Sequence, residues 1–273
     1  MRYDMHVHSN ISGDCAETMA DVCRAAIDKG LAGICFTDHC DMISGTAPGE
    51  AAETCFTDWE RSYREITAVR AEFGDRIEIL HGIELGELVQ DAARAEQFAV
   101  RAPNLDFLLG SVHAIPGHPD FYFLDYPDLA FCRKMTELYI DENIRMAELN
   151  LADVAAHIGY LSRYISHAGM WVDLMDYEER LRHLFGILVR NGRGIEVNTS
   201  GLRRNPGPNF TMPVLPIVKL FRDCGGEIVT IGSDAHFAKH VGSHLAEAEE
   251  LLRTAGFRYV TVFRQRKPAF IKL

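Results

Sequence analysis

The chemistry that this sequence can perform starts at two histidines close to its N-terminus, His6 and His8, which stand one residue apart. On a strand, side chains two positions apart point to the same face, so both imidazoles can bind one metal ion. An isolated pair of this kind is a weak signal. It is stronger here because short apolar runs recur along the chain, and most of them end in histidine, aspartate or glutamate.

The possible metal ligands lie at the ends of these runs and in the turns that follow them. Together they form one set of imidazoles and carboxylates. The set is His6, His8, Asp14, His39, Glu84, His113, His157, Asp234 and His236. One tetrahedral zinc ion uses three or four ligands, so this set predicts two or three divalent ions. Imidazole and carboxylate ligands without thiolate suit Zn, Mn or Fe, and the spacing does not choose among them.

The elements that must position these residues alternate between strand and helix. Strands are expected at 3–8, 31–39, 77–85, 106–113, 153–157, 194–198 and 227–233, with a last extended run at 259–263. Helices are expected at 18–29, 57–73, 91–101, 128–150, 176–191, 213–224 and 243–255. This alternation predicts a parallel sheet with crossover helices. Seven such units suit a closed or nearly closed α/β barrel, in which active sites lie at the C-terminal ends of the strands.

The bulk composition narrows the class of protein. The chain has 273 residues, 47% of them hydrophobic and 25% charged, which is typical of a globular protein, and we expect one domain over 1–273. The net charge of -11 argues against an extended nucleic-acid surface. No apolar run is long enough to span a membrane and no signal peptide is apparent. Seven cysteines without a Cys-x-x-Cys motif predict reduced thiols and a cytoplasmic protein.

Six short motifs, in this order along the chain, resemble those of one known family. They are HxHxxxSxD at 6–14, Thr37-Asp38-His39, Gly82-Ile83-Glu84, Ser111-Val112-His113, Ala156-His157 and Gly232-Ser233-Asp234-Ala235-His236. Together they resemble the polymerase-and-histidinol-phosphatase (PHP) family, and within it the histidinol-phosphate phosphatases. The resemblance implies a distorted (β/α)7 barrel with a trinuclear metal site.

The resemblance also implies how the ligands are shared among three ions. The first ion would be held by His6, His8, Glu84 and Asp234. Glu84 would bridge to the second ion, held with His113 and His157. The third would be held by Asp14, His39 and His236. Some relatives have a histidine where this chain has Asp14, and a carboxylate there still suits a hard cation.

The activity that the resemblance implies is metal-dependent hydrolysis of a phosphate monoester, L-histidinol phosphate, in histidine biosynthesis. Metal ions neutralise the phosphoryl oxygens and lower the pKa of a bound water towards ~7. The expected nucleophile is therefore a hydroxide between the first two ions, attacking phosphorus in line. Either a water or the pair Asp234 and His236 would protonate the leaving alkoxide, and the sequence leaves both open.

Residues outside the ligand set are expected to bind the substrate. Arg163 and Arg203 lie in the segments after two strands, which we interpret as loops, and guanidinium groups bind phosphate with paired donors. The long loop 114–127 contains Asp120 and Tyr122, which suit an ammonium and an imidazole. Glu196 and Asn198 are expected to orient metal ligands.

Other functions remain open at this stage. The same site could act on nucleotides or nucleic-acid ends, or the chain could be a metal-bound module that supports a partner without catalysis. Hydrolysis of C–N bonds is a further possibility, since a barrel alone does not decide the reaction. We expect a small-molecule phosphate ester as the partner, with no membrane and no nucleic acid, and the sequence does not predict the oligomeric state.

Overall fold

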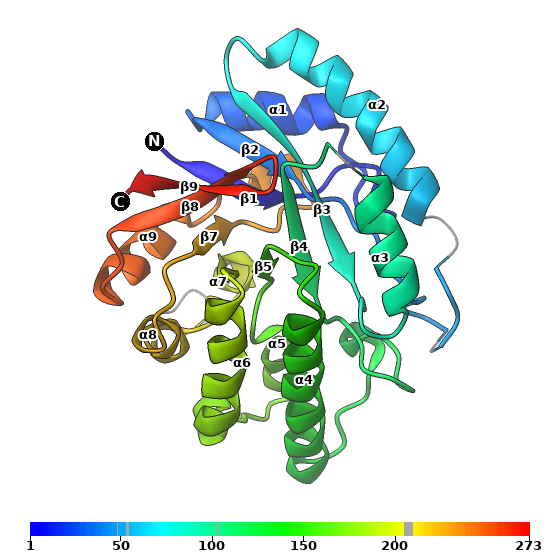
Figure 1. The fold of residues 1–273 in the computed structure, drawn as a ribbon, viewed down its shortest axis with the longest axis vertical. Coiled ribbons are helices and arrows are strands. Elements are labelled where there is room, and N and C mark those ends of the chain that lie inside the picture. The colour runs from blue at the N-terminus through cyan, green and yellow to red at the C-terminus, as the bar shows by residue number, and fades with distance from the viewer. Residues whose placement is uncertain (48, 53–54, 103, 205–209) are drawn as a thin grey trace.

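Seven parallel strands stand side by side in the order of the sequence in a computed structural model of the chain (Figure 1). The structure describes residues 1–47, 49–52, 55–102, 104–204 and 210–273. The strands are β1 (Tyr3–Val7), β2 (Gly33–Phe36), β3 (Glu78–Gly86), β4 (Phe107–Ser111), β5 (Val154–Ala155), β6 (Gly194–Asn198) and β7 (Val229–Gly232). The first and last strands meet through a parallel bridge between Val7 and Ala235, so the sheet curls into a nearly closed barrel. The predicted fold class is confirmed.

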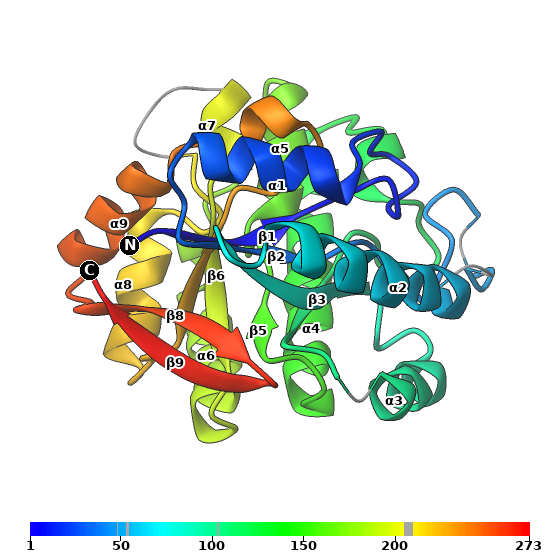
Figure 2. The same cartoon turned by 90° about the horizontal axis from the view of Figure 1, so that it is seen from above.

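Helices surround the strands on the outer side of the sheet (Figures 1 and 2). They are α1 (Met19–Asp28), α2 (Cys55–Phe73), α3 (Ala92–Arg101), α4 (Leu129–Leu149), α5 (Tyr160–His167), α6 (Glu178–Arg190), α7 (Ser200–Arg204), α8 (Leu215–Asp223) and α9 (Leu245–Thr254). Their starts follow ordinary capping chemistry: the Thr18 hydroxyl accepts a hydrogen bond from Asp21 N at 3.2 Å, and the Asp128 carboxylate accepts one from Phe131 N at 2.8 Å.

Two of these helices replace segments that the sequence predicted to be loops. Helix α5 follows β5 and buries Leu161, Tyr164 and Ile165 on one face. Helix α7 follows β6 and has five residues. Both are too short for their apolar spacing to stand out in the sequence, because a helical stripe needs several turns to be distinguished from chance. The loop prediction around Arg163 and Arg203 was therefore wrong.

The inside of the barrel is filled by apolar side chains below the strand ends. They are Met5, Cys35, Leu80, Phe107, Leu109 and Val154 from the strands, Ala156 just after β5, and Val262 and Phe263 from the last part of the chain. These strand residues alternate with residues that face the helices, as the period of two requires. The filled interior makes the barrel a rigid support for whatever lies at its open end.

The end of the chain forms an antiparallel hairpin, β8 (Tyr259–Arg264) and β9 (Lys267–Lys272), where the sequence predicted a single extended run. Its two turn residues, Gln265 and Arg266, have positive φ values of 50° and 62°, as tight hairpin turns require. Arg266 forms an ion pair with buried Asp153 just before β5. The hairpin closes the barrel at the end opposite the strand C-termini, and the two chain ends lie near each other (Figure 2).

Cys40 and Cys55 form a disulfide, with Cα atoms 4.6 Å apart. The prediction that all the thiols are reduced was wrong at this pair, and the other five cysteines are free. The segment after β2 turns back because Met42 N donates to Gly86 O at 3.0 Å and Ala52 N donates to Met42 O at 3.1 Å. That turn brings together two cysteines whose separation of 15 residues suggests nothing by itself. Among the described residues, no helix combines the length and apolarity needed to cross a membrane.

Candidate metal centre

The predicted ligands lie at one end of the barrel because parallel strands end on the same side. Strand β1 carries His6 and is followed by His8, and β3 carries Glu84. His39, His113 and His157 come two or three residues after the ends of β2, β4 and β5, and Asp234 and His236 follow β7. Asp14 lies in the turn after β1. All nine are joined by contacts between side-chain N and O atoms of 3.9 Å or less.

Glu84 stands at the middle of this cluster and divides it into two parts. Its Oε2 atom is 3.2 Å from His6 Nε2 and 3.5 Å from His8 Nε2. Its Oε1 atom is 3.1 Å from His113 Nε2 and 2.7 Å from His157 Nε2. The carboxylate therefore offers one oxygen to each pair of histidines, which is the arrangement that a ligand bridging two ions requires.

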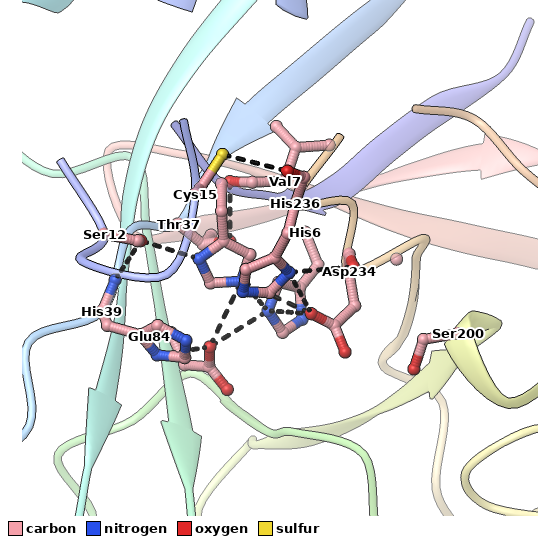
Figure 3. Close-up of polar contacts among 12 residues, drawn as sticks. His6, Val7, Ser12, Cys15, Thr37, His39, Glu84, Ser200, Asp234 and His236 are labelled. Carbon is pink, nitrogen blue, oxygen red and sulfur yellow. Dashed lines mark hydrogen bonds and ion pairs between the residues drawn. The ribbon is translucent and has the colours of Figure 1, made fainter. Parts of the chain in front are cut away.

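Asp234 lies close to His6 at another side of the cluster (Figure 3). The Asp234 carboxylate is 3.5 Å from His8 Nε2 and 3.4 Å from His236 Nδ1. His236 Nε2 is 3.0 Å from the Asp14 carboxylate, which is more than half exposed. The cluster thus opens to solvent on the side of Asp14.

Two of these predicted ligands have backbones in the left-handed region that residues other than glycine rarely adopt. His157 has φ 22° and Asp234 has φ 54°. Such conformations cost about 1–3 kcal/mol each and persist where the surrounding structure enforces them. Here Asp234 N donates to His6 O at 2.8 Å, which ties the turn after β7 to β1.

The ionisation of the cluster follows from burial and mutual charge. Burial opposes the charged form of Glu84, but the surrounding imidazoles, His6 first, hold the pKa of its carboxyl well below the usual range. Burial also opposes the charged form of His6, but Glu196 and Glu84 raise its pKa well above the usual range. Burial, followed by the nearby His236, lowers the pKa of His8. Metal binding to such a cluster displaces protons, so the occupancy of the site depends on pH.

The donor set fits divalent metal ions. His6 and His8 turn their Nε2 atoms toward each other at 3.0 Å, and His113 and His157 do so at 3.4 Å. Imidazole nitrogens that face one another in a buried site are well placed to share a cation. Four groups have their ligand atoms within 4.8 Å of one another: His6, His8 and Asp234; Glu84, His113 and His157; His8, His39 and His236; and His39, Asp41 and His113.

Asp41 is a member of this cluster that the sequence analysis missed. Its Oδ1 atom is buried without a hydrogen-bond partner and lies 3.9 Å from His113 Nδ1. A Cβ atom at Gly86 would overlap with the Asp41 carboxylate, so only a glycine at position 86 leaves room for this side chain. The only signal in the sequence was its place two residues after His39, in the stretch between the strand expected at 31–39 and the helix expected at 57–73.

Arg163 lies beside the cluster on α5. Its Nη2 atom donates to Ser200 Oγ at 2.9 Å and is 3.7 Å from the Asp234 carboxylate. The guanidinium stacks over the Tyr160 ring at 5.0 Å, and that ring in turn lies 4.9 Å from the His157 ring. The side chain is only 15% exposed, so its charge is directed toward the metal centre rather than toward solvent.

Arg203 has a different environment. Its guanidinium donates to the backbone carbonyls of Ser233 and Asp234, the latter at 3.0 Å from Nη2. These contacts hold the turn that carries Asp234. Its predicted contact with phosphate stays a prediction.

The predicted substrate residues of loop 114–127 lie at the rim. Asp120 accepts a hydrogen bond from Tyr122 N at 2.7 Å, and its own N donates to Gly45 O at 2.9 Å. Tyr122 is 64% exposed and lies against Tyr164, with ring centroids 6.1 Å apart. Neither residue belongs to the four groups of possible ligands among the described residues.

Comparisons with known proteins place the chain in a family. A sequence profile of the PHP domain matches residues 4–200. The chain is 28% identical to a histidinol-phosphatase of Lactococcus lactis, over 97% of this chain and 96% of that protein. It is 27% identical to a probable histidinol-phosphatase of Thermotoga maritima, over 95% of this chain and 94% of that protein.

Solved structures agree with this assignment. The crystal structure of the Lactococcus lactis histidinol phosphate phosphatase, in complex with zinc, L-histidinol and phosphate, superposes with a TM-score of 0.82 at 25% identity, covering 98% of each chain. A putative histidinol phosphatase of Listeria monocytogenes shares the fold, with a TM-score of 0.77 at 18% identity over 90% of this chain and 99% of that one. From its sequence profile, its relatives and its fold, this chain belongs to the PHP domain family.

Proposed function

We propose that this chain is a metal-dependent phosphomonoesterase that hydrolyses L-histidinol phosphate to L-histidinol and phosphate. The observation that carries the proposal is Glu84, whose two oxygens face separate pairs of histidines beside the guanidinium of Arg163. Support for the substrate comes from the Lactococcus lactis structure, which holds zinc, L-histidinol and phosphate. We propose the cytoplasm as its compartment: five cysteines are free, whereas the Cys40–Cys55 disulfide departs from the reduced thiols that this compartment favours.

The metal ions would be held as the resemblance implies, with Glu84 shared between two of them. His6, His8 and Asp234 would complete the first position, and His113 and His157 the second. Asp14, His39 and His236 would hold a third ion, and we infer two or three divalent ions of Zn, Mn or Fe. When bound, such ions neutralise phosphoryl oxygens and lower the pKa of water so that it can act as a nucleophile at neutral pH.

The protein's own side chains would orient the ester and move its protons. Arg163, held by Ser200 and stacked on Tyr160, would donate to a phosphoryl oxygen, and the resemblance gives Arg203 the same role. The leaving alkoxide would take its proton from a water or from the pair Asp234 and His236, which lie 3.4 Å apart at the open side of the cluster.

The rest of the substrate would lie between the loops at the rim. Histidinol phosphate carries an ammonium close to the ester oxygen, so it needs a negative charge near the metal ions. Asp120 would supply this charge, and the partly buried Asp41, 3.9 Å from His113 Nδ1, would add a second carboxylate. The exposed ring of Tyr122 would pack against the imidazole.

The proposal is tested by measuring phosphate release from L-histidinol phosphate, a nucleoside monophosphate and a 5′-phosphorylated oligonucleotide, together with elemental analysis of the protein. We expect L-histidinol phosphate to be the preferred substrate and the metal-free protein to be inactive. His8→Ala should lose bound metal and activity together, whereas the exposed His183→Ala on α6 should keep both. Preference for the nucleotide would reject the substrate, and an active, metal-depleted His8→Ala would reject the metal assignment.

A further inference from the structure

Glu196 lies under the metal centre without belonging to any of its groups of ligands among the described residues. It is on β6, between β5 and β7, and is 1% exposed. Its Oε1 atom is 2.7 Å from His6 Nδ1, and its Oε2 atom accepts a hydrogen bond from the backbone N of His157 at 2.9 Å. One carboxylate therefore contacts a residue from each half of the cluster that Glu84 divides.

The contact with His6 determines which ring nitrogen is free. An ionised carboxylate can only accept hydrogen bonds, so His6 Nδ1 must carry the hydrogen. In a neutral imidazole the other nitrogen, Nε2, then keeps its lone pair, and this is the nitrogen that faces His8 and Glu84. A hydrogen-bonded carboxylate behind a metal-ligating histidine orients the ring and makes it a better ligand.

The contact with His157 controls the backbone rather than the ring. His157 has φ 22°, which ordinary strand geometry does not provide. The hydrogen bond from its N to Glu196 holds the residue in this conformation, and the ring then reaches Glu84 Oε1 at 2.7 Å. Glu196 thus orients ligands of both ion positions from one point.

The neighbouring strand leaves room for this arrangement. Gly232 at the end of β7 faces Glu196, and a Cβ atom there would overlap with Glu196 Oε1 and His6 Cβ. Such overlaps cannot exist, so a side chain at 232 would push the carboxylate and the imidazole apart. Asn198 Nδ2 also donates to Glu196 Oε2, at 3.2 Å.

We propose that Glu196 is a positioning residue that makes the two ion positions on either side of Glu84 form together, by fixing the tautomer of His6 and the backbone of His157. The inference rests on the metal centre of the proposed function but not on its substrate. It predicts that losing this one carboxylate, which binds no ion itself, weakens both positions.

Glu196→Gln is the discriminating substitution because glutamine has one acceptor where glutamate has two. If its oxygen accepts from His157 N, its amide donates to His6 Nδ1 and moves the ring hydrogen to Nε2. If its oxygen accepts from His6, its amide faces the N–H of His157, donor against donor. In either case one half of the cluster loses its orientation, and because Glu84 is shared by both halves, the other ion position is weakened with it.

The experiment titrates zinc into metal-free protein and measures affinity, ions bound per chain and the rise in Tm on loading. We expect zinc affinity to fall about 10–100-fold for Glu196→Gln, with a smaller rise in Tm on loading, measured for each variant relative to its own metal-free protein. The matched control is Glu142→Gln, the same change at a glutamate of 2% exposure on α4, outside the centre, which should bind zinc like the wild type.

A second variant covers the case in which Glu196→Gln does not fold. Gly232→Ala keeps the carboxylate but displaces it, and should also lower zinc affinity. Wild-type zinc affinity in the folded Glu196→Gln protein, or in Gly232→Ala if only that variant folds, would overturn the proposal. These measurements use no substrate, so a wild type that binds zinc but ignores L-histidinol phosphate would reject the proposed function alone.

Discussion

At the scale of single residues, the position of Arg163 combines charge with restricted motion. Its guanidinium lies between the Tyr160 ring and Ser200, close to Asp234, and little of it is exposed. A phosphate dianion placed at the metal centre would meet a cation that is already oriented, so little conformational entropy is lost on binding. This makes Arg163 the strongest test of phosphate binding outside the metal ligands.

Arg163→Ala should lower kcat/KM for the phosphate ester while leaving the bound metal unchanged. A hydrogen bond to a charged group is worth about 1.5–3 kcal/mol, which corresponds to roughly a 10–150-fold loss. Arg163→Lys should give an intermediate value, because it keeps the charge but loses the planar pair of donors. The control is Arg182→Ala on α6, where the arginine pairs with Glu178 at the surface. Unchanged kinetics in Arg163→Ala would show that phosphate binds elsewhere.

At the scale of elements, the C-terminal hairpin is part of the barrel core rather than an appendage. Phe263 on β8 is 2% exposed and stacks on Phe107 of β4, with ring centroids 5.0 Å apart. Phe270 on β9 belongs to the same hairpin but is 49% exposed. The two phenylalanines therefore provide a matched comparison between a buried and an exposed ring.

Phe263→Ala should lower the free energy of unfolding by about 3–5 kcal/mol, because it leaves a cavity inside the barrel. Phe270→Ala should change it by less than about 0.5 kcal/mol. Urea unfolding of the metal-free proteins measures both values without the contribution of bound ions. Equal unfolding midpoints for the two variants would mean that the hairpin does not fill the barrel.

At the scale of the whole molecule, a buried histidine away from the metal centre makes the stability depend on pH. His81 on β3 is 1% exposed, and its Nε2 atom lies 2.9 Å from Ser62 Oγ. Burial, together with the charge of Arg70, lowers the pKa of His81 to about 4. In the unfolded chain the ordinary histidine pKa is ~6.5, so the unfolded state binds a proton over a range where the folded state does not.

Neutral His81 stabilises the folded protein above pH ~6.5, and this stabilisation is lost as the pH falls toward 4. The free energy of unfolding then decreases by about 3 kcal/mol. His81→Gln removes this titration. The free energy of unfolding of the wild type relative to His81→Gln should therefore fall by that amount between pH 7 and pH 4. His183→Gln, at an exposed position on α6, should run parallel to the wild type. A constant difference between wild type and His81→Gln would show that His81 titrates normally.

Much of the fold and of the ligand set follows from local sequence. Alternating strands and helices predict parallel strands, and parallel strands bring their C-terminal residues to one end, so residues as distant as His6 and His236 were expected together. The structure places them in one cluster with Glu84 at its centre. Their roles as metal ligands stay a prediction for the metal titrations to test.

Other contacts at the site depend on how strands and loops that are distant in the sequence are placed next to one another. No local sequence pattern encodes this placement. Glu196 reaches both His6 and His157 only because β1, β5 and β6 contribute to the same closed barrel and Gly232 leaves the space between them. Asp41, the Cys40–Cys55 disulfide and the hairpin inside the barrel likewise depend on long-range packing. The sequence by itself determined which side chains end the strands, because secondary structure is local. Only the tertiary structure decided which of them touch, because side-chain contacts depend on the curvature and closure of the sheet.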